Sequence, residues 1–203
     1  MKNICTFASS SDALKACFVD EALKLSRLIA QHQMTLVNGG ANVGLMEAML
    51  REVQSHGART IGIIPEKMEK VNLISSHIDE LIVSTDMKER KAIMRERSDA
   101  FIALAGGFGT LEEILEVITL KQLDYHNKPI VFINTDGFYD DLFRQFEKSY
   151  DENFAKPIYR TLYYIASSAA EAMDYILNYS AEARESKWFE VPKAPSNSPE
   201  GES

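Results

Sequence analysis

The chain has 203 residues, 45% of them hydrophobic and 26% charged, which is typical of a soluble globular protein with a sizeable core. Its formal net charge of -8 argues against non-specific binding to nucleic acid or to an anionic membrane. Cys5 and Cys17 form no disulfide framework, and neither a signal peptide nor a membrane span is recognisable, so we predict a cytoplasmic protein.

Short apolar runs, often β-branched, alternate along the chain with longer segments of helical periodicity. The predicted strands span residues 3–8, 35–38, 60–64, 80–84, 100–104, 129–134 and 161–167. The predicted helices span residues 13–33, a segment that follows a glycine loop and ends near residue 57, and residues 87–97, 110–123, 138–152 and 168–179. Residues 66–77 are ambiguous.

This alternation predicts the α/β class, because strand–helix–strand units wind right-handed and build a parallel sheet with helices on both faces. We expect a single Rossmann-like domain with a doubly wound parallel sheet over residues 1–183. Residues 184–203 are rich in Pro and Ser, and we predict that they form a disordered tail.

Three loops with unusual sequences follow predicted strands. They are ASSSD at residues 8–12, NGGANVG at residues 38–44 and AGGFGT at residues 105–110. Because ligands of doubly wound sheets bind outside the carboxyl ends of the strands, topology alone brings these loops to one crevice. Gly39 and Gly40 in the second loop are therefore candidates for ligand contact.

The loop AGGFGT lies between a strand and a helix, which is the context of a phosphate site. Gly106, Gly107 and Gly109 let backbone N–H groups approach an anion, and the helix N-terminus adds unpaired donors and the positive end of its dipole. The loop is not a Walker A motif, because the Lys-Ser/Thr ending is missing, and it fits the dinucleotide fingerprint poorly. A tight turn without a ligand is the alternative.

Two carboxylates follow this loop within the first helical turn, where they should repel a bound phosphate. Glu112 is most simply a solvated residue that complements the helix dipole. Thr110 and Glu113 fit a capping box, in which Glu113 reaches back to the backbone of Thr110. Glu113 nevertheless falls off the apolar stripe of this helix, at the mouth of the predicted crevice.

The charged run MKERKAIMRER at residues 87–97 has one partly apolar face. Met87, Arg90, Met94 and Arg97 share that face at helical spacing. An arginine there either extends past the core or points into a site, and this helix leads into the strand before AGGFGT. The four histidines show no metal-ligand spacing, so we predict no metal site.

Four segments combine into a family signature: GGANVGLM, MKERK, DAFIALAGGFGTLEEILEVIT and QLDYHNKPIVFINTDGFYDDL. They resemble the Lonely guy (LOG) family, cytokinin riboside 5′-monophosphate phosphoribohydrolases long mislabelled lysine decarboxylases, up to about residue 152. The family's M-x-E-R-K segment and P-G-G-x-G-T-x-x-E motif imply catalytic roles for Arg90 and Glu113. The positions implied to contact substrate are Lys91, Gly107, Phe108, Gly109, Thr110, Leu111, Glu112 and Thr119. The resemblance also implies a Rossmann-type fold, a homodimer or higher assembly, and no cofactor.

The sequence departs from the family pattern at three places. Ala105 replaces the proline of the motif, which should loosen the turn between strand and loop. The first loop, usually G-S-S, reads Ala8-Ser9-Ser10, and Asn72 stands where the family commonly has a glutamate. These departures bear on substrate choice more than on reaction type.

A nucleoside 5′-monophosphate would reconcile an anion cradle with a nearby carboxylate. The phosphate would bind the glycine loop, while Glu113 would stabilise the positive charge that develops on the anomeric carbon as the N-glycosidic bond breaks, or activate water against it. Arg90 would orient the ribose or phosphate, or hold Glu113 ionised. The expected substrates are cytokinin riboside 5′-monophosphates, AMP or other purine monophosphates, and the products are a free base and ribose 5-phosphate.

Two other functions are open at this point. A nucleotide or cofactor carrier on the same fold would bind its ligand without hydrolysis. An amino-acid decarboxylase would carry a yellow, lysine-linked cofactor, although no lysine of the sequence is specifically marked for that role.

Overall fold

The computed structural model describes residues 2–181, and the tail predicted for residues 184–203 lies outside them. The strands are β1 (Asn3–Phe7), β2 (Thr35–Asn38), β3 (Thr60–Pro65), β4 (Glu80–Ser84), β5 (Ala100–Ala103), β6 (Ile130–Ile133) and β7 (Tyr164–Ala166). The helices are α1 (Ala16–Gln31), α2 (Gly44–Ser55), α3 (Glu66–Glu69), α4 (Met87–Glu96), α5 (Phe108–Gln122), α6 (Asp140–Asp151) and α7 (Ala169–Leu177), with 3-10 helices η1 (Thr135–Gly137) and η2 (Pro157–Leu162).

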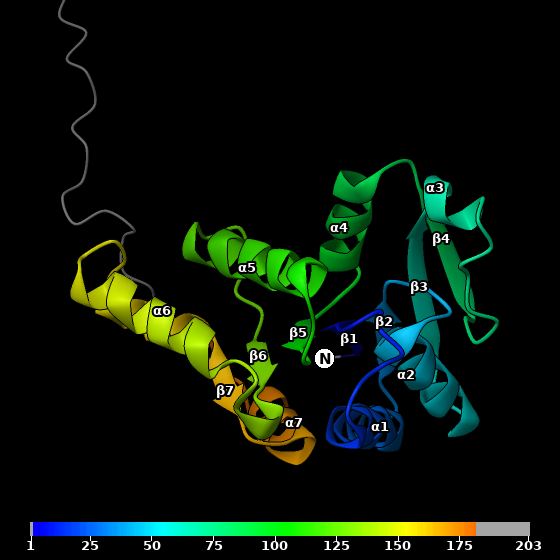
Figure 1. The fold of residues 1–203 in the computed structure, drawn as a ribbon, viewed down its shortest axis with the longest axis horizontal. Coiled ribbons are helices and arrows are strands. Elements are labelled where there is room, and N and C mark those ends of the chain that lie inside the picture. The colour runs from blue at the N-terminus through cyan, green and yellow to red at the C-terminus, as the bar shows by residue number, and fades with distance from the viewer. Residues whose placement is uncertain (1, 182–203) are drawn as a thin grey trace, which may run out of the picture.

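Within residues 2–181 the seven strands pair in one parallel sheet, in the order β4-β3-β2-β1-β5-β6-β7 (Figure 1). Cys5 of β1 lies opposite Val37 of β2 and Phe101 of β5. The chain runs outward from β1 to β4, returns to β5 on the other side of β1 and continues to β7. This reversal beside β1 is the switch point of a doubly wound sheet, so the predicted Rossmann-like fold is confirmed.

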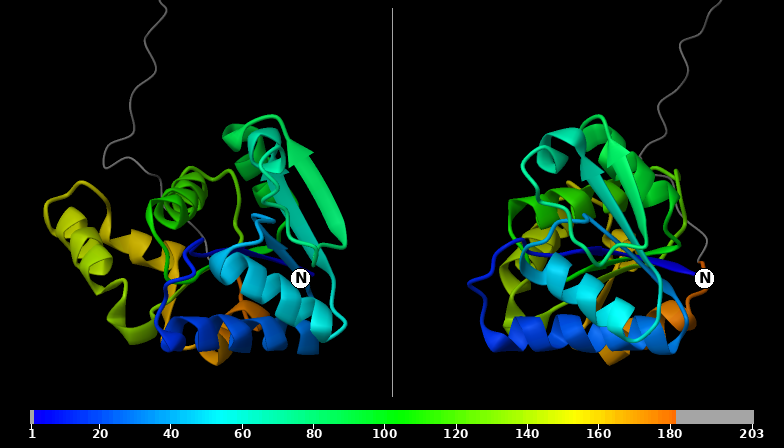
Figure 2. Two further views of the ribbon diagram at one scale, coloured as in Figure 1. Left: turned by 45° about the vertical axis from the view of Figure 1, so that its right-hand side comes forward. Right: turned by 90° about the vertical axis from the view of Figure 1, so that its right-hand side faces the viewer.

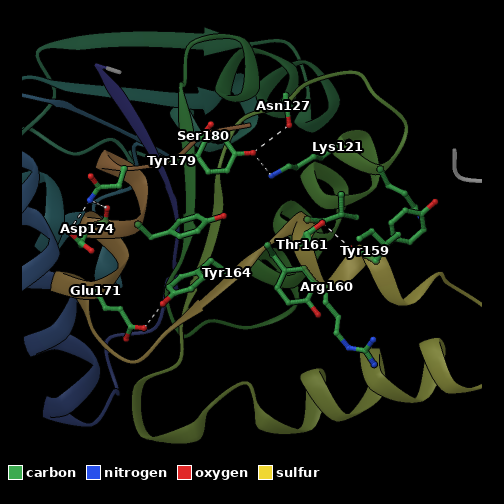
Figure 3. A pocket seen from close by; sticks show the side chains of 16 residues that line it. Lys121, Asn127, Tyr159, Arg160, Thr161, Tyr164, Glu171, Asp174, Tyr179 and Ser180 are labelled. Carbon is green, nitrogen blue, oxygen red and sulfur yellow. Dashed lines mark hydrogen bonds between the residues drawn. The ribbon is translucent and has the colours of Figure 1, made fainter. Parts of the chain in front are cut away.

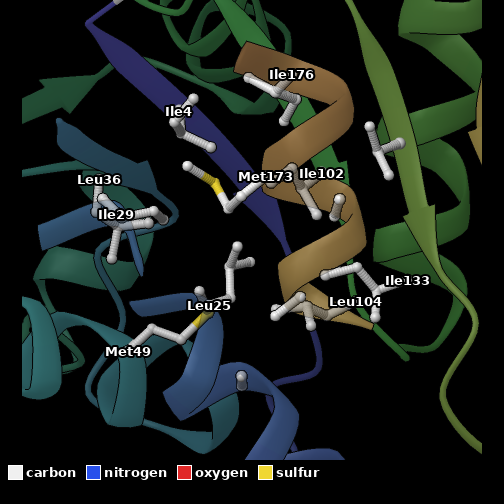
Figure 4. Packing of buried hydrophobic residues seen from close by; sticks show 14 of the residues in the cluster. Ile4, Leu25, Ile29, Leu36, Met49, Ile102, Leu104, Ile133, Met173 and Ile176 are labelled. Carbon is white, nitrogen blue, oxygen red and sulfur yellow. The ribbon is translucent and has the colours of Figure 1, made fainter. Parts of the chain in front are cut away.

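Helices cover both faces of the sheet, as the ribbon shows from three sides (Figures 1 and 2). Helices α1, α2 and α7 lie on one face, and α4, α5 and α6 lie on the other. Right-handed crossovers that leave β1 in opposite directions place their helices on opposite faces. Each face has its own apolar core; the first joins Leu25 of α1, Met49 of α2 and Met173 of α7 to Ile102 of β5 (Figure 4).

The position of a strand in the sheet explains its sequence pattern. Every residue of β5 is buried, because helices cover this inner strand on both faces, and the strand reads as an unbroken apolar run. The edge strand β4 alternates instead, with Leu81 and Val83 exposed. Within the described part of the chain, no helix has the length and apolar character needed to cross a membrane.

Two segments near the switch point refine the predicted boundaries. Helix α5 begins at Phe108, two residues before the predicted start, and Gly107 is its N-cap. The ambiguous residues 66–77 contain the short α3, after which Asn72 turns the chain in the left-handed conformation (φ 57°). An isolated bridge between Ala41 and Ile74 then attaches this segment to the loop after β2.

Leucine-to-alanine substitutions at two strand positions should separate the buried from the exposed parts of the sheet. Leu36 in β2 is 0% exposed, whereas Leu81 in β4 is 41% exposed. We expect Leu36→Ala to lower the free energy of unfolding by about 2–5 kcal/mol, because it leaves a cavity, and Leu81→Ala to lower it by less than about 1 kcal/mol. Chemical denaturation measures both changes, and equal losses would contradict the described core.

Candidate functional site

Hydrogen bonds donated by backbone N–H groups join the carboxyl ends of the strands on both sides of the switch point. The N–H of Gly44, at the start of α2, donates to the carboxylate of Asp12 in the loop after β1 (2.8 Å). The N–H of Leu104, after β5, donates to the carbonyl of Phe7 at the end of β1 (3.0 Å). The three loops that the sequence singled out therefore lie together at one end of the sheet.

Arg90 of α4 and Glu113 of α5 form a buried ion pair at this end. Nη1 of Arg90 lies 3.0 Å from Oε1 of Glu113, and the two side chains are 9% and 11% exposed. Nε of Arg90 donates a second hydrogen bond to the carbonyl of Ile63 in β3 (2.9 Å). The structure thus brings into contact the two residues for which the resemblance implies catalysis.

The environment of Glu113 favours its protonated form more than water does. Burial raises the pKa of the Glu113 carboxyl above its ordinary value. The guanidinium of Arg90 acts in the opposite direction, and the negative charge of Glu112 adds to the rise in pKa. A carboxyl whose pKa is moved towards neutrality is suited to accept a proton during a reaction.

The capping-box alternative for Thr110 and Glu113 is wrong. Because α5 begins at Phe108, Thr110 lies inside the helix, where its side chain is buried. The carboxylate of Glu113 pairs with Arg90 instead of reaching back to the start of α5. The ion pair between α4 and α5 therefore forms in place of the capping box that the local sequence suggests.

Among residues 2–181, no side chain caps the N-terminus of α5. Gly107, Phe108 and Gly109 are exposed there, Phe108 to 93%, and a Cβ added at either glycine would meet no atom within 4 Å. Gly106 is buried instead, and a Cβ there would overlap the hydroxyl of Thr110. An exposed, uncapped helix end with two open glycines can present backbone N–H groups to an anion.

Lys91 balances the charge of the second carboxylate, Glu112. Its Nζ contacts the carboxylate of Glu112 and lies 3.5 Å from that of Glu116, which also pairs with Arg95 (2.9 Å). Burial alone would lower the pKa of Lys91, but the hydrogen bond and charges of Glu112 and Glu116 outweigh it and raise that pKa. Lys91 is therefore held as a cation, which reduces the repulsion that Glu112 would exert on a bound anion.

The other predicted positions lie at different distances from the ion pair. Gly39, which precedes Gly40 in the loop after β2, lies directly against the guanidinium of Arg90. Leu111 packs against the core on the α4–α6 face. Thr119 is exposed and donates to the carbonyl of Leu115 within α5. Because six residues advance a helix by about 9 Å, one chain does not bring Thr119 to Glu113.

Three groups near the Arg90–Glu113 and Lys91–Glu112 pairs were not identified from the sequence. The carbonyl of Ile63 is a backbone group in an apolar strand and has no sequence signal. Met46 lies beside Gly39 but reads as a core residue of α2. Glu116 lies one turn after Glu112 on the same helix face, so its i,i+4 spacing could have identified it as a second partner of Lys91.

A pocket of about 580 Å³ lies at the β7 edge of the sheet, apart from the ion pair (Figure 3). Residues of η2, β7, the C-terminal part of α5, and α7 with the segment that follows it line the pocket. The rings of Tyr164 and Tyr175 stack in its wall with their centroids 4.2 Å apart. None of its lining residues is a predicted site residue, so this cavity does not coincide with the site that the chemistry indicates.

Residues 46–176 match the model of a protein family described as "possible lysine decarboxylase". The matched span contains the Arg90–Glu113 pair and the N-terminus of α5, but it begins after the glycines of the loop that follows β2.

Several plant proteins are similar to most of the chain. Cytokinin riboside 5′-monophosphate phosphoribohydrolase LOG7 of Arabidopsis thaliana is 38% identical over 196 residues, which cover 95% of this chain and 90% of that protein. LOG5 of the same plant, with the same enzyme name, is 38% identical over 178 residues, or 88% of this chain and 78% of that protein. The probable phosphoribohydrolase LOG6 is 41% identical over 170 residues, which cover 84% and 85%.

Solved structures of similar fold include proteins that are named as binding or carrier proteins. The molybdenum cofactor binding protein of Rippkaea orientalis is 26% identical with a TM-score of 0.66, over 87% of this chain and 96% of that chain. A molybdenum cofactor carrier protein of Chlamydomonas reinhardtii is 23% identical with a TM-score of 0.67, over 87% and 96%. At that identity the second likeness supports the fold alone.

The titration of Glu113 should report its two charged neighbours. We expect its pKa to lie above the value of about 4.3 for an exposed glutamate, to rise further in Arg90→Ala and to fall in Glu112→Gln. Carbon-13 NMR of the side-chain carboxyl against pH measures all three values. Because the folded pKa is raised, the carboxyl contributes stability below its unfolded pKa, and this contribution is lost as the pH rises through the folded pKa. A pKa at or below that of exposed glutamates would contradict the described burial.

Proposed function

From the premise that this chain belongs to the family described as possible lysine decarboxylase, with relatives named cytokinin riboside 5′-monophosphate phosphoribohydrolases, we propose that it is a phosphoribohydrolase. It hydrolyses the N-glycosidic bond of a nucleoside 5′-monophosphate to a free base and ribose 5-phosphate. The observation that carries this proposal is the buried Arg90–Glu113 pair, which lies beside an uncapped, glycine-rich helix end.

The 5′-phosphate binds at the N-terminus of α5. Its oxygens accept hydrogen bonds from the backbone N–H groups of the first turn, and the positive end of the helix dipole favours their charge. The absence of a side-chain cap at Gly107 and the open space at Gly109 support this placement. Lys91, paired with Glu112, offsets the negative charge that this carboxylate would otherwise place near the phosphate.

Glu113 acts on the anomeric carbon. As the glycosidic bond breaks, its electron pair passes to the base nitrogen, and positive charge develops on C1′ and the ring oxygen. The carboxylate of Glu113 stabilises this charge and takes a proton from the water whose oxygen bonds to C1′. The base nitrogen takes a proton from solvent, and Glu113 then releases its proton to solvent, so that one water is consumed. Its raised pKa makes Glu113 a better proton acceptor than an exposed glutamate, provided that it is ionised.

Arg90 helps to keep the carboxyl of Glu113 ionised. Without a cation, burial would hold the Glu113 carboxyl protonated over a wider pH range, and a protonated carboxyl neither stabilises positive charge nor accepts a proton. The hydrogen bond from Nε to Ile63 fixes the guanidinium while Nη1 faces Glu113. The guanidinium has five N–H donors, and those not used by Ile63 and Glu113 can serve the ribose or the phosphate when substrate is bound.

The substrate is a purine nucleoside 5′-monophosphate, either a cytokinin nucleotide or AMP. The names of the relatives favour the cytokinin nucleotide, which differs from AMP in a substituent on the adenine N6. We further propose that the enzyme is cytoplasmic and homodimeric. A sedimentation experiment that finds only monomers at micromolar concentration would overturn the last point.

Purified protein should release free base from AMP or from an N6-prenylated AMP, measured by chromatography over a panel of nucleoside monophosphates. We expect Glu113→Gln, which keeps the shape of the side chain, to lower turnover by about 10²–10⁴-fold, because the charge and the proton acceptor are lost. Glu52→Gln is the matched control. Glu52 of α2 also forms an ion pair, with Arg27 of α1, but the pair lies outside the proposed site, so this variant should keep wild-type turnover. Wild-type turnover in both Glu113→Gln and Arg90→Ala would contradict the assignment.

The second candidate is a nucleotide or cofactor carrier without hydrolysis, and the likeness to the molybdenum cofactor binding protein of Rippkaea orientalis favours it. A carrier would bind AMP or another ligand tightly and yield no free base after a long incubation. Calorimetry and chromatography on the same sample separate the two functions.

A further inference from the structure

Three elements surround the guanidinium of Arg90. Its Nε donates a hydrogen bond to the carbonyl of Ile63 in β3, and its Nη1 donates one to the carboxylate of Glu113 in α5. Its Nη2 lies against the backbone of Gly39, in the loop that follows β2. The arginine of the ion pair between α4 and α5 is therefore also in contact with a backbone segment that belongs to neither helix, the loop after β2.

Gly39 leaves no space for a side chain. A Cβ built on its backbone would overlap Nη2 of Arg90 and would lie 2.8 Å from Sδ of Met46. Real Cβ atoms essentially never approach a neighbour below 3.0 Å. Both overlapped atoms lie towards the ends of long side chains, so Arg90 and Met46 would move rather than the backbone, and Arg90 could move only by disturbing its bonds to Ile63 and Glu113. Gly39 does not adopt the left-handed conformation, unlike Gly40 (φ 69°), and its requirement is therefore for space alone.

Hydrogen bonds of the Asn38 side chain hold the loop around Gly39 in its position next to Arg90. The side chain of Asn38 donates to the carbonyl of Met46 (3.2 Å) and accepts from the N–H of Gly40 (2.9 Å), and Asn38 is fully buried. A larger residue at position 39 would therefore push the guanidinium rather than the loop.

We propose that Gly39 is a positioning residue, whose missing side chain leaves the space in which the guanidinium of Arg90 reaches Glu113. The glycine loop after β2 then acts on the reaction through Arg90 and not by contact with substrate, which was its predicted role. This inference deepens the proposed function and rests on it for its catalytic consequence. Its structural part, the position of Arg90, stands independently of any reaction.

The Gly39→Ala variant should displace Arg90 from Glu113. The Nε–H of Arg90 should give a shifted or broadened NMR signal as its bond to Ile63 weakens, and the pKa of Glu113 should rise as it loses the opposing charge. We expect kcat/KM for AMP to fall by about 10²-fold, since displacement of a catalytic group by roughly 1 Å has that effect. The loss should fall on kcat more than on KM.

A double-mutant cycle separates positioning from substrate contact. In the Arg90→Ala background, Gly39→Ala should cause less than about a twofold further loss, because the guanidinium that it displaces is already absent. If Gly39 contacted the substrate, the two losses would multiply. Multiplying losses, or an Arg90 Nε–H signal and a Glu113 pKa that are unchanged in Gly39→Ala, would overturn the proposal.

Two further variants keep the result interpretable. Gly57→Asn removes a glycine at an exposed position where a Cβ meets no described atom within 4 Å. Its left-handed conformation (φ 74°) strains most side chains but asparagine least, so the variant should keep the wild-type Arg90 signal, Glu113 pKa and kcat/KM. If Gly39→Ala folds poorly, Gly39→Ala/Met46→Ala relieves the second overlap and should restore folding but not the Arg90 signal. If the wild type releases no base, the proposed function fails, and the NMR signal and pKa still decide the role of Gly39.

Discussion

The ion pair between Arg90 and Glu113 is the interaction on which the rest of this site depends. Two charges are taken out of water between α4 and α5, and removing water from a buried pair costs several kcal/mol per ion unless further polar contacts compensate. The carbonyl of Ile63 provides one such contact, and the bare backbone of Gly39 allows the guanidinium to reach it. A buried pair of this kind is weak evidence for stability, but it holds an acid with a raised pKa at a fixed point beside a helix end.

The doubly wound sheet explains why these distant parts of the chain meet. Reversal of the strand order at β1 places the ends of β2 and β3 on one side of the switch point and the start of α5 on the other. Helix α4 crosses back between the two sides and carries Arg90 to Glu113 and Lys91 to Glu112. The adjacent carboxylates Glu112 and Glu113 therefore pair with different cations. For this reason an anion-binding N-terminus and a catalytic acid can share the first turns of one helix.

The sequence predicted the inner strands well, because strands buried on both faces must be apolar. It placed the start of the edge strand β7 three residues too early, where the 3-10 helix η2 ends. It also predicted the convergence of the loops, which follows from topology. It predicted the start of α5 less well. Thr110 and Glu113 satisfy a local capping rule, but the helix begins two residues earlier, and Arg90 of α4 takes the carboxylate of Glu113 as its partner. The contact of Arg90 with the Ile63 carbonyl could not be predicted, since a backbone carbonyl in an apolar strand is identical in every sequence that forms that strand.

In the proposed reaction, the N-terminus of α5 binds the phosphate while Glu113 faces the sugar carbon of the same molecule. A crystal structure of the Glu113→Gln variant with AMP tests this most directly, because the variant should bind the nucleotide without consuming it. We predict phosphate oxygens within hydrogen-bond distance of the backbone N–H groups of residues 107–110, and C1′ of the ribose in contact with the side chain at position 113. A nucleotide bound in the pocket at the β7 edge, or with its phosphate away from α5, would contradict the account.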